Sequence, residues 1–145
     1  LDMGIYPIAL DALFNTDDAP CVVLNSDVAP NGADNDVLWM YRYNEVVSVL
    51  HSSFKSNLGN DAHLIGTEGT IKIPDFWMAS TCTLFKGLEE EAHFSDKRKG
   101  SGFEFEIRHA CEHILNKTHE SDVMPFSVSR RFQERLRRVS ENIKR

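Results

Sequence analysis

The spacing of apolar side chains changes after Gly100-Ser101-Gly102, and that change constrains the fold more than any other feature. Between Cys21 and Phe94, apolar and polar residues alternate in short runs, and this period of two predicts β-strands. After Gly100-Ser101-Gly102 the period becomes 3.6, which predicts helices. The strands are expected at residues 21–28, 36–43, 45–54, 62–66, 70–74, 81–86 and 91–94, with hairpin turns at Tyr43-Asn44-Glu45 and at Gly87.

Helices are expected at both ends of this series of strands. A short helix covers Pro7–Phe14, a longer one runs from Phe103 to about Lys117, and a third lies near the C-terminus. Their expected inner faces are Leu10, Leu13 and Phe14; then Phe103, Ile107, Ala110, Cys111 and Ile114; then Phe132, Leu136, Val139 and Ile143. This order predicts an α+β fold, with one open, mixed but mainly antiparallel sheet of six or seven strands and helices packed on one face.

Length and composition limit the classes of protein that this chain can belong to. A chain of 145 residues is expected to form a single domain over residues 1–145. Residues 1–128 carry 20 acidic and 9 basic side chains, so the body is acidic and an affinity for nucleic acid is not expected. There is no run of about 20 apolar residues for a membrane span. Three widely spaced cysteines, with no signal segment, predict reduced thiols in a cytoplasmic protein.

The most specific chemistry lies at the N-terminus, where Asp2 and Tyr6 belong to a D-x-G-x-Y-P pattern. A carboxylate and a phenol four residues apart fall on the same side of one helical turn. Gly4 permits an irregular turn between them, and Pro7 is expected at the first helical position. Tyr6 and Asp2 are therefore candidate proton-transfer and substrate-orienting groups. The alternative is that Tyr6 is a half-buried core aromatic and Asp2 a helix cap.

An ordered set of motifs resembles a known enzyme family. The set consists of Asp2–Ile8, Ser53–Asn57, Gly66–Pro74, Gly102–Ile107 and Ser121–Phe126. In this order and spacing they resemble the C-terminal half of the glucose–fructose oxidoreductase and inositol dehydrogenase family. Within it the trans-dihydrodiol dehydrogenase-like branch is the most similar, because that branch has a tyrosine at the place of Tyr6 where a histidine is commoner.

The resemblance implies a role for the chain as a fragment of a larger two-domain oxidoreductase, in which it is the substrate-binding and dimerisation domain. No G-x-G-x-x-G fingerprint follows a parallel strand here, so NAD or NADP is expected to bind mainly to a missing N-terminal Rossmann domain. The cofactor-binding residues of this chain are unknown. The chain begins without a methionine, which favours a fragment that is inactive alone. The expected partners are a small sugar-like or cyclic diol substrate and a second copy of the chain, bound through the open sheet face.

The same resemblance assigns roles to individual side chains. Tyr6 would be the general acid/base, helped by a lysine of the missing half, and Asp2 would orient it or the substrate. Trp77, at a bend after a strand, and Phe103, at the start of a helix, would form an aromatic wall of the substrate pocket. Core packing is an equally good explanation for Trp77 and Phe103. The alternative function is a non-catalytic binding or dimerisation module with the same sheet.

Two charged features are expected to have no catalytic role. His109-Ala110-Cys111-Glu112-His113 matches the H-x-x-E-H zinc signature. The apolar stripe of that helix lies on the opposite side, so the two histidines are expected to face solvent or a partner, and no metal site is predicted. The arginines of the last helix are expected to form a solvated or intersubunit face, namely Arg130, Arg131, Arg135, Arg137 and Arg138.

Overall fold

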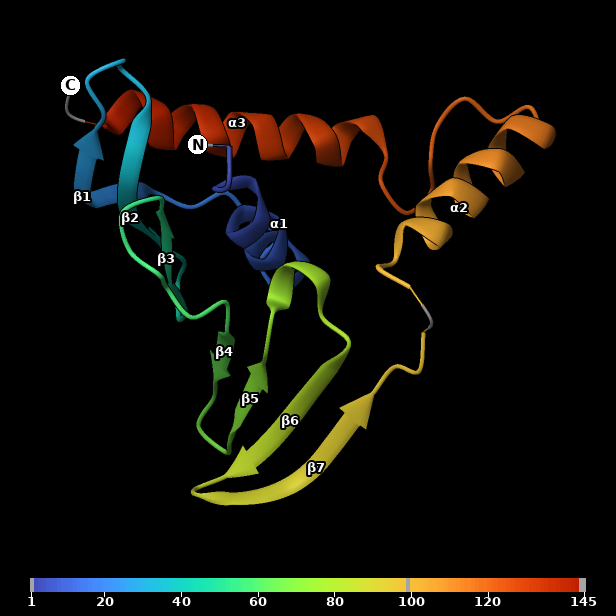
Figure 1. Cartoon of the computed structure of the whole chain (residues 1–145), viewed down its shortest axis with the longest axis horizontal. Helices are drawn as coiled ribbons and strands as arrows, with labels where there is room; N and C mark the ends of the chain where they lie inside the picture. The colour runs from blue at the N-terminus through green and yellow to red at the C-terminus, as the bar shows by residue number, and fades with distance from the viewer. Residues whose placement is uncertain (1, 99, 144–145) are drawn as a thin grey trace. The chain divides into compact units, whose positions relative to one another are not determined.

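The computed structural model describes residues 2–98 and 100–143 (Figure 1). These residues divide into two compact units. The first unit combines the N-terminal part of the chain up to Leu58 with the C-terminal part from Met124, and the second runs from Gly59 to Val123. No helix among the described residues is long and apolar enough to cross a membrane.

The first unit is a three-stranded sheet covered by two helices. Its elements are α1 (Ile5–Phe14), β1 (Cys21–Val28), β2 (Asp34–Arg42), β3 (Val47–Ser53) and α3 (Phe126–Asn142). All strand pairs are antiparallel in the order β1-β2-β3, and the β2–β3 turn forms at the expected place. Both helices contact the sheet and each other, so α1 and α3 pack as a pair over the sheet (Figure 1).

The core of the first unit forms where the central strand meets these helices. Trp39 is fully buried on β2, with Val23 of β1 and Leu50 of β3 as its register partners. Val139 on α3 and Ile8 on α1 are also fully buried. The apolar stripe predicted for the last helix is therefore confirmed. Its period of 3.6 residues gives α3 one apolar face, and this face packs against the sheet.

Helix α1 differs from its prediction in its start and in its inner face. It begins at Ile5, which places Pro7 at the third helical position, where a missing N–H still costs no intrahelical bond. Leu13 is 75% exposed and Phe14 54% exposed, so the expected inner face is wrong for these two residues. The buried residues are Ile8, Asp11 and Ala12. A polar contact made by Asp11 determines which side of the helix faces inward, as described below.

The second unit contains an antiparallel meander. Its elements are β4 (Ala62–Ile65), β5 (Thr70–Ile73), η1 (Phe76–Met78), β6 (Thr81–Lys86), β7 (Glu89–Ser95) and α2 (Phe103–Leu115). The strands are hydrogen-bonded in sequence order, β4-β5-β6-β7. Gly87 forms the β6–β7 turn with φ +64°, a conformation that glycine adopts without steric cost.

The α+β class and the antiparallel pairing are confirmed, but the seven strands form two sheets instead of one. The division falls directly after β3. The Ser53 hydroxyl oxygen accepts hydrogen bonds from the backbone N–H groups of Lys55 and Ser56, both at 3.1 Å. This local turn takes the chain out of the ladder, so the next strand does not add to the edge of β3.

Helix α2 has the expected span but the opposite pattern of burial. The stripe predicted to face inward is exposed, with Phe103 at 67%, Ile107 at 63% and Ile114 at 74%. His109 and His113, expected to face solvent or a partner, are the partly buried residues of this helix. The segment after α2 folds back against the histidine side, and this contact, rather than apolar periodicity, decides the burial.

Candidate functional site

Asp2 and Tyr6 lie at the start of α1, one in the turn before the helix and the other in its first turn. Asp2 lies in the turn and is exposed, while Tyr6 is the second residue of α1 and is 40% exposed. The backbone N–H of Tyr6 donates to the carbonyl oxygen of Met3 at 3.4 Å. The N-cap residue is Gly4, so Asp2 does not occupy the capping position. Both side chains reach the surface, as groups that act on a bound molecule must.

A buried ion pair anchors α1 and thereby determines where Tyr6 lies. Arg135 of α3 donates from Nη1 to Asp11 Oδ2 at 2.8 Å, and the two side chains are 4% and 2% exposed. The Tyr43 hydroxyl donates to the same carboxylate oxygen at 2.6 Å, and Asn15 donates to the other at 2.9 Å. Burial and the bond to this carboxylate raise the pKa of Tyr43 well above its usual value. The network joins α1, α3 and the β2–β3 turn.

The burial of Arg135 corrects the prediction that it belongs to a solvated face. Its second nitrogen donates to the backbone carbonyls of Asn15 at 2.9 Å and Asp17 at 3.0 Å, and its guanidinium carbon lies 5.4 Å from the Tyr41 ring centroid. A signal for this was present in the sequence. Position 135 lies four residues before Val139, on the apolar stripe of α3, where a charge requires a buried partner.

In the second unit, hydrogen bonds hold the aromatic turn η1 from both sides. Phe76 N–H donates to the Asn60 carbonyl at 3.0 Å, and Met78 N–H donates to the Asp75 carbonyl at 2.8 Å. Arg98 donates to the carbonyls of Met78 and, at 2.7 Å, Ala79. Trp77 is 49% exposed at the middle of this turn. Arg98 holds the turn that carries Trp77, and the sequence did not reveal this contact because Arg98 follows β7 and lies about 20 positions from the turn.

Phe103 starts α2 and is also largely exposed. The preceding Gly102 has φ +98°, and its N–H donates to the Glu104 carboxylate at 3.1 Å, which directs the chain into the helix. Neither Phe103 nor Trp77 is buried, so core packing does not explain them. Asp2 and Tyr6 belong to the first unit, and Trp77 and Phe103 to the second.

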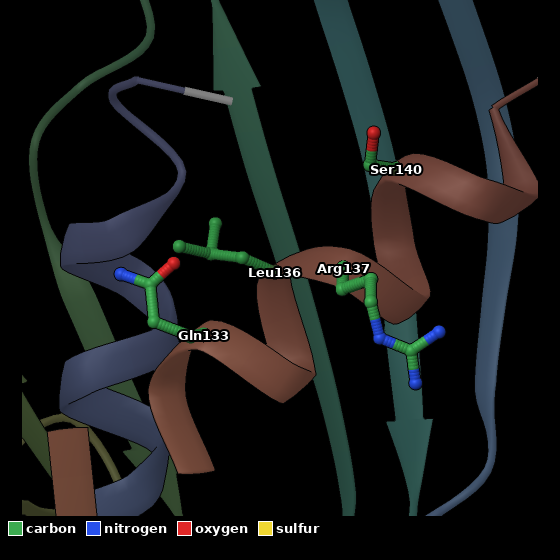
Figure 2. Close-up of a pocket in the computed structure, with 4 residues that line it drawn as sticks. All are labelled: Gln133, Leu136, Arg137 and Ser140. Atoms are coloured by element: carbon green, nitrogen blue, oxygen red, sulfur yellow. The ribbon is translucent and has the colours of Figure 1, made fainter. Parts of the chain in front are cut away.

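One hollow in the first unit lies on α3, and none of the four candidate residues lines it. It has a volume of about 290 Å³ and is lined by Gln133, Leu136, Arg137 and Ser140 (Figure 2). All four side chains come from one helix, and none is a carboxylate, histidine or cysteine. This hollow offers no chemistry.

Comparison with known proteins relates the chain to dehydrogenases. It is 26% identical over 140 residues to trans-1,2-dihydrobenzene-1,2-diol dehydrogenase of Xenopus laevis, and 26% identical over 137 residues to the protein of that name from Xenopus tropicalis. Each match covers 89% of this chain but only 42% of the relative, so the chain spans less than half the length of these relatives. No family model matches the chain. The relationship is distant, and both relatives are named as dehydrogenases.

Proposed function

We propose that this chain is the C-terminal, substrate-binding part of an NAD(P)-dependent dehydrogenase or reductase that acts on a sugar-like or cyclic diol substrate. The distant similarity to dihydrodiol dehydrogenases over 89% of the chain supports the class. The observation that carries the proposal is Tyr6, 40% exposed on a helix that a buried ion pair holds in place, with Asp2 in the preceding turn.

The described residues do not fit a dinucleotide-binding unit. Such a unit needs a parallel strand, a glycine-rich loop and a helix whose N-terminus meets the pyrophosphate. Both sheets here are entirely antiparallel. In the proposal, NAD or NADP is therefore bound by another domain of a longer protein, which supplies the hydride chemistry.

The proposed task of this chain is to bind the substrate and move a proton. The Tyr6 hydroxyl donates a proton to a carbonyl oxygen that becomes an alcohol, or accepts one in the opposite direction. A phenol loses its proton near pH 10 in water, so a cation beside it is needed for work near neutrality. The exposed carboxylate of Asp2 accepts a hydrogen bond from a substrate hydroxyl. Trp77 and Phe103 are proposed as apolar substrate contacts because both present exposed aromatic rings.

The experiment replaces single atoms in the full-length dehydrogenase. Tyr6→Phe keeps the ring and removes the hydroxyl, so kcat should fall by roughly 10²- to 10⁴-fold, the usual contribution of a positioned proton donor. Asp2→Asn should have a smaller effect, because the amide still forms hydrogen bonds. This effect should fall mainly on KM. Tyr41→Phe is the matched control, since Tyr41 is 1% exposed and cannot meet a substrate. Near-normal turnover of a folded Tyr6→Phe enzyme would show that the assignment is wrong.

The outer face of the first sheet supports a second proposal, that the protein forms a homodimer. Val22, Met40 and Val49 are register partners across β1, β2 and β3, on the face opposite Trp39. Val22 is 43% exposed and Val49 64% exposed. A contiguous apolar row of this kind is typical of a partner surface.

A further inference from the structure

Three potential metal ligands meet beside α2. His109 and His113 lie one helical turn apart with ring centroids 4.3 Å from each other, and Asp122 reaches them from the segment that follows the helix. Asp122 Oδ1 lies 3.4 Å from His109 Nε2 and 3.3 Å from His113 Nε2. One ligand atom from each residue lies within 4.8 Å of the others. The arrangement is contained within the second unit.

The hydrogen bonds of Thr118 determine which nitrogen of His113 is available. The Thr118 hydroxyl donates its single proton to the backbone carbonyl oxygen of His113 at 3.0 Å. It can therefore only accept from Nδ1 of the same histidine, 2.6 Å away, so Nδ1 carries a hydrogen. In the neutral ring this leaves a lone pair on Nε2, pointing at a carboxylate oxygen. Two acceptors in this position require a cation between them, either a proton or a metal.

His109 presents the same nitrogen to the same oxygen. Its Nε2 is 2.8 Å from the Ser121 hydroxyl oxygen, which also accepts from the backbone N–H of Val123. The Ser121 contact keeps His109 Nε2 turned toward the Asp122 segment. A metal ion at this nitrogen would take the place of the Ser121 hydrogen bond, while the Thr118 bond to His113 stays intact as an outer-shell contact that orients the ligand.

The spacing of the ligand atoms discriminates between metals. Bonds of about 2.05 Å in a tetrahedral zinc site place neighbouring ligand atoms about 3.3 Å apart. An octahedral site with bonds of about 2.1 Å places them about 3.0 Å apart. Two of the three spacings, 3.3 and 3.4 Å, are close to the tetrahedral value, and all three ligand atoms lie within 4.8 Å of one another. Two imidazoles and one carboxylate are also a common zinc ligand set.

We propose that His109, His113 and Asp122 bind one zinc ion, with water as the fourth ligand. This replaces our expectation from the sequence, which predicted no metal site at the H-x-x-E-H match and both histidines facing solvent or a partner. The Asp122 side chain is 79% exposed, so the ion binds at the surface. Its role is to fasten the segment after α2 to the helix, since the ligands come from both.

Zinc binding to the purified full chain tests the proposal. Isothermal titration calorimetry with zinc chloride should give one ion per chain, and Co²⁺ should give the intense visible absorption of a tetrahedral site. Asp122→Asn and His113→Gln should each weaken binding by at least the roughly 10- to 100-fold that loss of an outer-shell partner costs. Thr118→Val keeps the shape of the side chain and removes the Nδ1 acceptor, so it should weaken binding about tenfold.

Two variants serve as matched controls. His119→Gln removes an exposed histidine near the cluster, and Cys111→Ser removes the exposed thiol on the same helix. Both should bind zinc like the parent chain. The proposal fails if the chain does not bind one zinc ion saturably, if Asp122→Asn binds zinc as tightly as the parent chain, or if Cys111→Ser loses binding. The Asp122 side chain is exposed, so Asp122→Asn should keep the fold. This variant therefore tests the proposal even if a histidine variant does not fold.

Discussion

Replacement of Arg135 by methionine should strongly destabilise the first unit. The substitution keeps most of the aliphatic stem but removes the cation from a pair in which both side chains are at most 4% exposed. It leaves the Asp11 carboxylate buried with two neutral donors, Tyr43 and Asn15. The backbone carbonyls of Asn15 and Asp17 lose their donor as well.

The orphaned charge determines the size of this effect. Breaking a buried ion pair by removing one partner costs about 3–5 kcal/mol, and that is a large part of the roughly 5–15 kcal/mol by which a domain is stable. Arg137→Met is the control on the same helix. Its ion pair with Glu141 has side chains that are 61% and 57% exposed, so the loss should be within about 0.5 kcal/mol.

Urea unfolding monitored by tryptophan fluorescence measures this difference. Trp39 is fully buried in the first unit and Trp77 lies in the second, so a Trp77→Phe background makes the signal specific to the first unit. With a slope of about 1–3 kcal/mol per molar urea, the Arg135→Met midpoint should fall by about 2 M. A fall no larger than that of Arg137→Met would refute the reasoning.

A second substitution separates the orphaned charge from lost packing. Asp11→Asn keeps the size of the side chain and removes its charge. Added to Arg135→Met, it should restore at least about 1 kcal/mol, because the buried carboxylate is what makes the single variant costly. If the double variant is no more stable than Arg135→Met, the loss comes from packing and not from charge.

Two further predictions concern the thiols and the outer sheet face. Burial raises the pKa of Cys21 from 9.0 to about 11. The contribution of the protonated thiol to stability is therefore complete below pH 9 and is lost as the pH rises toward 11. Urea unfolding midpoints should fall across this pH range. At neutral pH a thiol reagent should modify exposed Cys111 before Cys21, and the opposite order would contradict this assignment. Val49→Lys places a charge in the apolar row of the first sheet and should convert a dimer to a monomer in sedimentation velocity, whereas Lys55→Ala should not. A parent chain that is monomeric at high concentration would refute the dimer.

The elements that carry the candidate residues were predictable because their sequence signals are local. The D-x-G-x-Y-P pattern predicts a turn followed by a helix from neighbouring residues alone, and the structure has a turn followed by α1 there. The bend that carries Trp77 is similarly marked by its neighbours. What anchors these segments was not predictable, since Asp11 and Arg135 are 124 positions apart and Arg98 reaches back about 20 positions to Met78.

The sequence by itself determined the order and type of the elements, because alternation with a period of two or 3.6 is a local property of strands and helices. Among the described residues, the seven strands and the first two helices occur where they are predicted, within a few residues at each end, and the third helix lies near the C-terminus as expected. The tertiary structure alone decided where the sheets divide, which side of α2 is covered and which groups pair with Arg135. Each depends on a polar contact made after a turn or across the chain, and hydrophobic periodicity carries no information about the partner of a charge or a hydroxyl.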